Sequence, residues 1–401
     1  MDKNTIIGFV LIAAVLFGYS WFTKPTPEQL QELQRRNDSI AQVEQKKLEE
    51  IQQSQMVAGN ADSTITVLNE DSLRQVQMKE AFGIFSDFTT GENEKINLKN
   101  DLVSLSFSSK GGALTEATLN KYKTHDSLPL TLFDEKDNEY GFIFKTGGRI
   151  VNTTDLFFKP IAGKDGKSVT MRLDFGNGKF FDLVYTLPED SYMVKMDIRQ
   201  KGMETILPGN TASLDLFWNQ NLRSQEKGRM FEERNSALYY KFVGSDVDHL
   251  SESKDEQETI SLGLKWIGYK NQFFSSALIP DGKFNGALIR SGMNNDPAYL
   301  KNFHTETTVD YNPADNNGPG FRFYLGPNLY PLLHSYDKGV DDDKALDLDK
   351  LVPLGFKFFR WINTWIIIPI FTFLGKYIAN YGIIILLMTI IIKIFLAPLT
   401  F

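Results

Sequence analysis

Cysteine is absent from the 401 residues of this sequence. Its absence excludes disulfides, thiolate metal sites, cysteine nucleophiles and lipids attached through cysteine. Histidine is scarce as well, with four residues that form neither an HExxH nor an HxH pair: His125, His249, His304 and His334. None shows local pairing with a carboxylate, although residues distant in sequence can converge in a fold. We therefore expect no metal site and no cofactor.

A surplus of positive charge is also lacking, because the formal net charge is -7. Nucleic-acid-binding proteins normally carry a basic patch, so this balance argues against a nucleic-acid partner. The sequence contains no GxxxxGK[ST] phosphate-binding loop, and we expect no nucleotide. The charge is an average over unlike segments and does not exclude a membrane protein.

The chain begins with an uncharged, mainly apolar run from Thr5 to Phe22. Its length is close to the roughly 20 apolar residues that are needed to cross a bilayer. A cleaved signal peptide would have a more basic start, and the aromatic residues around Ser20 fit a cleavage site poorly. We therefore predict an uncleaved transmembrane signal anchor over residues 1–23, with a cytoplasmic N-terminus by the positive-inside rule.

Residues 24–81 are predicted to form a polar linker. Pro25 and Pro27 end the first helix, and Glu28–Gln55 is rich in residues of good helix propensity. The apolar positions do not keep a heptad, which favours a solvated, partly helical linker over a coiled coil. Such a linker would carry the following domain away from the membrane.

The character of the sequence changes over residues 82–335. Short alternating runs such as LVSLSFS, FFDLVYTL and YMVKMDIRQ are separated by Gly, Asn, Asp and Pro. This pattern is typical of strands, and frequent strands with few helical stretches predict a large β-sandwich. Roughly 250 residues suffice to bury a proper core.

A helical pattern follows at residues 348–366. Polar residues fall between four apolar side chains that have helical spacing. These apolar side chains are Phe358, Trp361, Ile362 and Trp365. Tryptophan at the edge of an apolar face suits an amphipathic helix in the membrane interface; the alternative is a helix packed on the β domain. The acidic residues 341–349 lack the spacing of a calcium loop and indicate a surface connection.

Residues 377–401 are predicted to form a second transmembrane helix, because this long apolar stretch carries a single charge, Lys393. A charge at bilayer depth is costly and marks a side chain that faces protein or water, or one that snorkels to the interface. Lys393 follows Tyr381 by about 12 residues, or about 18 Å along a helix, and so lies in the inner half of the bilayer. Thr389 shares its face.

The order of these segments resembles the YidC-type membrane protein insertases of Gram-negative bacteria, over nearly the whole chain. The resemblance rests on a basic residue five positions before Pro-Leu-Thr, Lys393 with Pro398, Leu399 and Thr400, and on SKGGALTEATLNKY at 109–122, KWIGYKNQFFSSALIP at 265–280 and FYLGP at 323–327. The fold it implies is a mainly β periplasmic domain, a β-supersandwich similar to sugar mutarotases, followed by transmembrane α-helices.

The resemblance also implies a protein that breaks no covalent bond and is not an enzyme. It would aid insertion, folding and assembly of inner-membrane proteins, with or without the Sec translocon, through a hydrophilic groove. Lys393, with Thr389 beside it, would attract acidic parts of the substrate in this groove. The expected partners are nascent membrane proteins, the Sec translocon and the lipid bilayer. Residues 24–376 would be periplasmic in a multi-pass protein of the bacterial inner membrane.

Two departures from the family pattern bear on this expectation. The family position is commonly Arg, and Lys393 keeps the charge but not the bidentate fork. The sequence stops at Phe401, so we expect an N-terminal portion that lacks the remaining walls of the groove. Two other functions stay open: a membrane-tethered periplasmic docking domain without insertase activity, and, more remotely, a carbohydrate-active mutarotase-like enzyme with a positioned acid and base.

Overall fold

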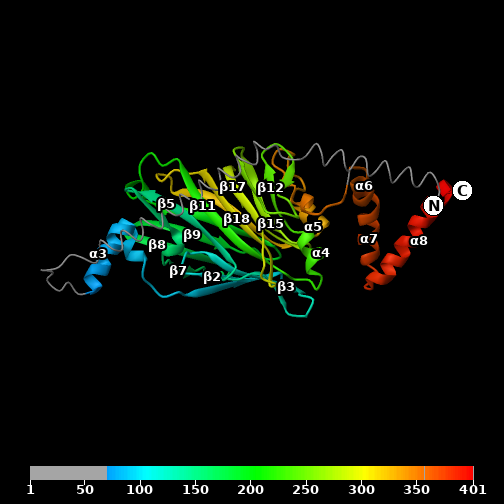
Figure 1. Cartoon of the computed structure of the whole chain (residues 1–401), viewed down its shortest axis with the longest axis horizontal. Coiled ribbons are helices and arrows are strands. Elements are labelled where there is room, and N and C mark those ends of the chain that lie inside the picture. Colours follow the sequence, from blue (N-terminus) through cyan, green and yellow to red (C-terminus); the bar gives the residue numbers. More distant parts are fainter. Residues whose placement is uncertain (1–69, 356, 401) are drawn as a thin grey trace, which may run out of the picture. The chain divides into compact units, whose positions relative to one another are not determined.

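The computed structural model describes residues 70–355 and 357–400. The signal anchor predicted for residues 1–23 lies outside this part, as does most of the linker predicted for 24–81. From Arg74 onward the chain forms one compact unit, and many of its elements are labelled in Figure 1.

Strands dominate the described residues between Lys95 and Pro327. Their bounds are β1 Lys95–Lys99, β2 Val103–Ser108, β3 Leu114–Lys123, β4 Pro129–Phe133, β5 Asn138–Thr146, β6 Arg149–Asn152, β7 Lys159–Ala162, β8 Ser168–Gly176, β9 Lys179–Thr186, β10 Met193–Lys201, β11 Ser213–Arg223, β12 Ala237–Phe242, β13 Val247–His249, β14 Glu256–Ile260, β15 Leu264–Lys270, β16 Phe274–Pro280, β17 Phe284–Met293, β18 Tyr299–Asp310 and β19 Asn317–Pro327.

Helices and helical turns lie before, between and after the strands. Their bounds are α3 Glu70–Phe82, α4 Arg229–Arg234, α5 Tyr330–Ser335, α6 Lys357–Ile362, α7 Ile368–Gly375 and α8 Tyr381–Thr400, with 3-10 turns η1 Gly83–Phe88, η2 Thr153–Asp155, η3 Met203–Thr205 and η4 Leu348–Leu351, and a π-turn η5 Asn363–Ile367.

Within the described residues the strands form two antiparallel sheets. The smaller sheet has four strands in the order β1-β2-β3-β4. The larger has 15 strands along the path β6-β5-β11-β18-β17-β15-β16-β19-β10-β9-β8-β7, with β12, β13 and β14 attached to its middle. Consecutive strands that pair, such as β8 with β9 and β9 with β10, need only short connections, which explains the frequent turn residues of the sequence.

The alternation seen in the sequence reflects the two faces of each strand. In β11 every second side chain is buried, and the side chains between them are only partly covered or exposed. Successive side chains of a strand point to opposite faces of the sheet, so one face of β11 meets the core. Its largest core residue, Trp218, is 1% exposed.

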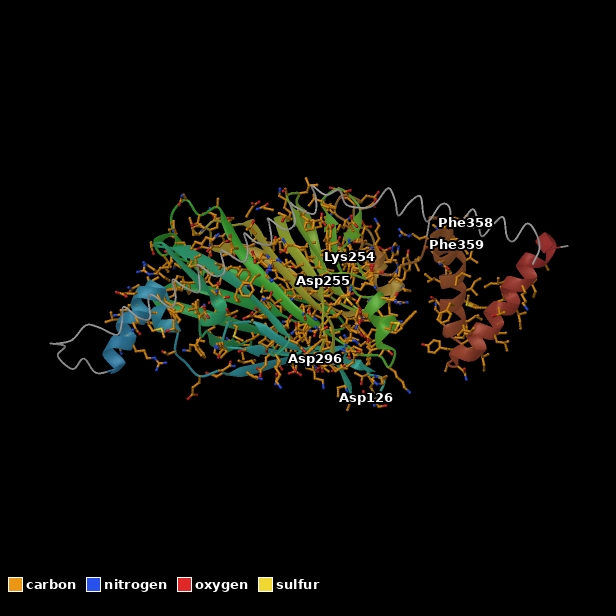
Figure 2. All side chains as sticks on the ribbon, viewed as in Figure 1. Asp126, Lys254, Asp255, Asp296, Phe358 and Phe359 are labelled. Carbon is orange, nitrogen blue, oxygen red and sulfur yellow. The ribbon has the colours of Figure 1, made fainter. Side chains whose placement is uncertain are left out.

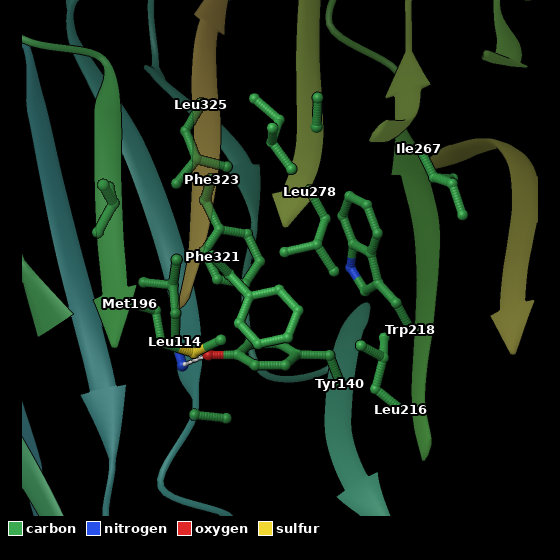
Figure 3. Close-up of a cluster of buried hydrophobic side chains, with 14 of the residues drawn as sticks. Leu114, Tyr140, Met196, Leu216, Trp218, Ile267, Leu278, Phe321, Phe323 and Leu325 are labelled. Carbon is green, nitrogen blue, oxygen red and sulfur yellow. Dashed lines mark hydrogen bonds between the residues drawn. The ribbon is translucent and has the colours of Figure 1, made fainter. Parts of the chain in front are cut away.

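Distant strands of the large sheet face each other across the core, where Figure 3 shows side chains such as Tyr140, Trp218 and Phe323 gathered in one cluster. Tyr140 of β5 lies with its ring centroid 5.1 Å from that of Phe323 of β19, although several strands separate β5 from β19 in the sheet. Trp218 stacks on Tyr269 of β15 at 3.8 Å between centroids. Aromatic pairs of this kind stabilise a fold beyond the area they bury.

The four-stranded sheet covers a further part of this core. Phe107 of β2 lies 4.6 Å from Tyr185 of β9 between ring centroids. The Tyr185 hydroxyl is 2.6 Å from that of Tyr140, and the Tyr140 oxygen also accepts the N–H of Leu114 at 2.9 Å. Buried hydroxyls are thereby satisfied. The mainly β supersandwich prediction is confirmed.

The helix predicted for 348–366 has different bounds in the structure. Leu348–Leu351 form the turn η4, whose two leucines are fully buried in the β-domain core. The following Gly355 has a φ of +82°, a backbone conformation that ends a helix, and α6 begins at Lys357. The helical run then continues through η5 and α7 as far as Gly375.

The π-turn η5 ends two residues before Pro369 of α7. Proline has no N–H and its ring clashes with the carbonyl four residues earlier, so an α-helix cannot continue unchanged through it. A π-turn is one local adjustment by which backbone groups freed by a proline are satisfied again. The Asn363 side chain at its start donates to the carbonyl of Leu354 at 3.2 Å, which fixes the entry into the helical run.

Candidate functional site

The charged residue of the last helix lies on the side of α8 that faces away from the neighbouring helix. Among the side chains of α8 that the structure describes, Ile384 and Met388 are buried, and the Cδ1 of Ile384 approaches Gly375 of α7. Lys393 is nine residues after Ile384, which at 100° per residue places it about 180° around the helix. Its side chain is exposed.

Thr389 shares this exposed side of α8 with Lys393. It is one turn before the lysine, and its Oγ1 donates to the carbonyl of Ile385 at 2.8 Å. Such a bond satisfies the hydroxyl within the helix itself. The polar face predicted from the sequence therefore consists of an ammonium group and, one turn earlier, a hydroxyl that can still accept a hydrogen bond.

The helix predicted over 377–401 starts four residues later than expected. Asn380 precedes α8, and its Oδ1 accepts the N–H of Gly382 at 2.9 Å. This is the arrangement of an N-cap residue, which begins a helix. Asn380 therefore belongs to the start of the helix and not to one of its faces. The Pro398, Leu399 and Thr400 motif lies within the last turn of α8.

The four residues predicted for an interfacial helix lie together in the run from α6 to η5. Trp361 and Trp365 are exposed, at 55% and 71%, as is Phe358 at 67%, whereas Ile362 is partly covered. Exposed tryptophans on an apolar helix are typical of the bilayer interface. Within the described residues, Phe358–Gly375 is the one helix with the length and composition to cross a membrane.

A cleft of about 530 Å³ opens on the β domain, between the β2–β3 hairpin, the β4–β5 turn and β11. Many of its lining side chains are polar, and amides are frequent among them: Asn93, Asn138, Asn219, Gln220 and Asn221. The Asn138 oxygen accepts the Trp218 indole N–H at 2.9 Å. Gln220 is 2% exposed, and its Oε1 has no hydrogen-bond partner among the described residues.

An ion-pair network borders this cleft. Arg223 binds both Asp137 and Asp134, the latter at 2.5 Å between Nη2 and Oδ2. Burial raises the pKa of Asp137, and the hydrogen bond from Arg223 opposes that shift. The cleft can therefore hold a polar ligand by hydrogen bonds to amides beside fixed charges. Its residues are scattered in sequence, so local motifs gave no signal for it.

The structure corrects our expectation that no histidine pairs locally with a carboxylate, and it also brings together one pair that is distant in sequence. The Nε2 of His304 lies 2.9 Å from Glu306, and the Nδ1 of His334 lies 3.3 Å from Asp349. Glu306 is two residues after His304 on β18, and residues i and i+2 of a strand point to the same face. The spacing of these two residues in a predicted strand is therefore a local signal for their pairing. Among the described residues, the lining of the cleft includes no histidine.

Three carboxylates gather near the end of the β domain, within 4.8 Å of one another: Asp337, Asp347 and Asp349. Each already has partners. Asp337 accepts the backbone N–H groups of Leu346 and Asp347. Asp347 pairs with Lys241 at 2.6 Å and Lys350 at 3.4 Å. These contacts assign the cluster a structural role in holding the chain that leads to α6.

Comparison with known proteins identifies relatives for the whole described sequence. The family model of the YidC periplasmic domain matches residues 95–371. The membrane protein insertase YidC of Parabacteroides distasonis is 46% identical over 100% of this chain and 63% of its own length. That of Porphyromonas gingivalis is 37% identical, with the same coverages. The chain thus spans about 63% of the length of these curated relatives.

Solved structures share less with this chain. YidC from Thermotoga maritima has a TM-score of 0.36 and 15% identity, over 78% of this chain and 70% of its own. A galactose mutarotase related enzyme from Lactobacillus acidophilus has a TM-score of 0.38 and 8% identity, over 58% of this chain and 97% of its own. Neither score supports a conclusion about activity.

Proposed function

The chain belongs to the YidC family, and we propose that it supplies the periplasmic domain and the first membrane helices of an insertase for inner-membrane proteins. In this proposal it is a multi-pass protein of the bacterial inner membrane, with a cytoplasmic N-terminus and residues 24–376 in the periplasm. It binds nascent membrane proteins, works with or without the Sec translocon, and breaks no covalent bond.

The observation that carries this proposal is the position of Lys393 on α8. The lysine lies opposite the side that packs towards α7, on the same face as Thr389. A charge that a membrane helix turns away from its neighbour has to meet another polar surface or water on that side, or snorkel to the interface. We propose that this face lines a hydrophilic groove together with further helices of the protein.

Lys393 would act by attracting acidic residues of a substrate segment that has to cross the membrane. A charge in a low-dielectric site exerts a field that bulk water would otherwise screen. The polar segment would be held part-way across while the substrate's apolar span moves into lipid. Burial of that span supplies the driving free energy, at roughly 25 cal/mol per Å², and the membrane potential adds to it for a charged segment. This scheme requires no nucleotide.

The test is an insertion assay with the full-length protein in proteoliposomes. Lys393→Gln should lower the insertion of a substrate with an acidic translocated segment at least fivefold, and Lys393→Arg should keep it near the unchanged level, because only the first removes the charge. Lys376→Gln, outside α8, is the matched control and should have no effect. A neutral translocated segment should be insensitive to all three changes. Equal insertion by Lys393→Gln and the unchanged protein would refute this role.

A second function is favoured by the polar cleft of the β domain. Its buried Gln220 amide and the neighbouring Asn138 would allow this domain to bind a polar partner in the periplasm. In that case the chain acts as a tethered docking domain, and the Sec translocon is the partner expected from the resemblance. Replacement of Asn221 and Asn93 by Leu would then abolish the docking while the insertion of Sec-independent substrates continued.

A further inference from the structure

One end of the β domain exposes a cluster of large apolar side chains. They come from the β3–β4 loop, from α4, from the turn between β15 and β16, and from the residue before α5: Leu128, Met230, Phe231, Phe273 and Leu329. Their exposed fractions run from 48% for Phe273 to 68% for Met230. We call these five residues the apical patch.

Polar contacts beneath the apical patch hold its four segments together. The backbone N–H of His125, in the β3–β4 loop, donates to the carbonyl of Gln225 at 3.2 Å. The Gln225 N–H donates to the buried carboxylate of Glu232 in α4 at 3.0 Å, and the Asn271 amide donates to the same carboxylate at 3.3 Å. Glu232 of α4 therefore binds the β15–β16 turn directly, and it is linked to the β3–β4 loop through Gln225.

The remaining segment is joined to the same turn. The backbone N–H of Asn328 donates to the carbonyl of Phe273 at 2.6 Å, and its side chain donates to the carbonyl of Asn271 at 3.1 Å. Leu329 follows directly. In Figure 1, α4, α5 and the loop after β3 gather at one end of the β domain, and Figure 2 labels Asp126 at the tip of that loop.

The exposed charges around the apical patch are mostly positive. Four exposed cations belong to its segments, Lys121, Lys123, Lys227 and Arg234, against one exposed carboxylate, Asp126. A second exposed carboxylate, Asp296, lies on the β17–β18 loop that Arg229 of α4 contacts. A set of apolar side chains with a basic border matches the surface of an anionic bilayer, where apolar groups enter the headgroup region and cations meet lipid phosphates. A contiguous apolar surface on a soluble domain marks an interaction site.

The chain itself holds this end of the domain close to the apolar helices. Leu351 of η4 is fully buried, and Val352 packs against the same core. The turn η4 lies beside α5, where His334 is 3.3 Å from Asp349. Only five residues lead from Val352 to Lys357, where α6 begins, and five extended residues span at most about 18 Å.

From these observations we propose that the apical patch docks on the surface of the anionic bilayer in which the helices of this chain reside. The proposal rests on the membrane placement of α8 given under the proposed function. A tether of this length keeps the patch within reach of the lipid headgroups, so docking requires no partner protein. The β domain would then stand on the membrane through its apical patch instead of hanging free on its tether.

Fluorescence of single labels tests the docking, and the cysteine-free sequence makes such labels specific. The full-length protein would carry Phe231→Cys or Phe273→Cys with an environment-sensitive dye, in vesicles of phosphatidylethanolamine and phosphatidylglycerol. Lipids with a nitroxide quencher near the headgroup should quench both labels at least twofold. Ile150→Cys on β6, at a position that is 69% exposed and so more exposed than either phenylalanine, should be quenched less than 1.2-fold. The quenching should fall when phosphatidylglycerol is omitted or salt is raised to about 1 M.

Two further labels keep the outcome unambiguous. Met230→Cys replaces either phenylalanine variant if circular dichroism shows that the variant has lost its fold. Leu386→Cys on α8 reports whether that helix lies in the bilayer. Quenching at Leu386→Cys without quenching at the apical patch would overturn the docking alone, whereas no quenching at Leu386→Cys would contradict the membrane placement. A blue shift at the patch without lipid quenching would show that protein covers it, and would also overturn the proposal.

Discussion

Lys241 and Asp347 form an ion pair between residues 106 apart in sequence, with Nζ 2.6 Å from Oδ2. Lys241 lies on β12 with 5% of its side chain exposed, and its Nζ also donates to the carbonyl of Ser245 at 2.8 Å. The indole N–H of Trp266 donates to the carbonyl of Leu346 at 2.6 Å. These contacts fasten the chain between α5 and α6 to the β domain, so the domain and the first apolar helix are joined by a short tether.

Lys241→Met should weaken the attachment of the chain between α5 and α6 to the β domain. Removing one partner of a buried pair costs about 3–5 kcal/mol, because the other charge stays behind. Asp347 is partly exposed and keeps Lys350 at 3.4 Å, so we expect the free energy of unfolding to fall by about 2 kcal/mol. Hydrogen exchange should accelerate at the backbone N–H groups of Leu346 and Asp347, which donate to Asp337.

Lys344→Met is the matched control for this change. Lys344 pairs with Asp341 at 3.2 Å, but both side chains are largely exposed, at 69% and 75%. Exposed pairs contribute about 0–1 kcal/mol, so the free energy of unfolding should hardly change. If Lys241→Met were as mild as this control, the tether would be held by packing of η4 alone and the role of the ion pair would be wrong.

Lys270 should make the stability of the β domain depend on pH in the alkaline range. Burial lowers the pKa of this lysine to about 8, and its Nζ donates to the carbonyl of Asn235 at 2.7 Å. The unfolded state, with a pKa near 10.5, binds more protons between pH 8 and 10. The free energy of unfolding therefore rises as pH increases through this window, by at most about 3 kcal/mol at about 1.36 kcal/mol per pKa unit.

The check is chemical unfolding at pH 7.5 and pH 10, for the unchanged protein and for Lys270→Met. Burial raises the pKa of tyrosines such as Tyr269, so their titration in the unfolded state alters the stability of both proteins alike. The informative quantity is therefore the difference between the two proteins. The stability of the unchanged protein relative to Lys270→Met should rise with pH, while Lys338→Met, at an exposed position, should follow the unchanged protein. A difference that stays constant between the two pH values would show that Lys270 loses no proton in the folded state.

The fold class was predictable because period-two alternation survives in strands such as β11, where one face is buried along its whole length. The curl of the large sheet was not predictable from such local patterns. It depends on pairs such as Tyr140 with Phe323, which are far apart in the printed sequence. Local periodicity gives the faces of a strand but not which distant strand will cover them.

The polar face of α8 was predictable to the same extent. The spacing of four residues between Thr389 and Lys393 fixes a shared face in any helix, whereas the buried side of α8 depends on the partner helix. The cleft of the β domain escaped prediction because Asn138 and Gln220 come from β5 and β11, which are distant in sequence and are united only by the sheet pairing. The bounds of α6 were missed because η4 looks helical in sequence but is fixed by burial of Leu348 and Leu351.

The helical run from Lys357 to Gly375 could either cross the bilayer or lie in the membrane interface, and the depth of its two ends distinguishes these placements. Its length and composition permit a bilayer crossing, yet Lys357 and Arg360 lie in its first turns and two exposed tryptophans follow. Charges beside exposed tryptophans favour the interface over the hydrocarbon core. We therefore predict that this run lies in the plane of the membrane and that its two ends have the same depth.

Spin labels at Phe359→Cys and Phe373→Cys measure this depth through their relative accessibility to oxygen and to a polar nickel complex. Both side chains are exposed, at 57% and 58%, and they are about 21 Å apart along a helix at about 1.5 Å per residue. In an interfacial helix their depths should agree within about 5 Å, because the helix axis lies parallel to the surface. Ile383→Cys and Ile394→Cys on α8 are the matched pair and should differ by about 16 Å if α8 spans. If the depths of the first two labels differed by nearly their full separation along the helix, Phe358–Gly375 would instead be a membrane crossing, and the direction of α8 through the bilayer would be reversed.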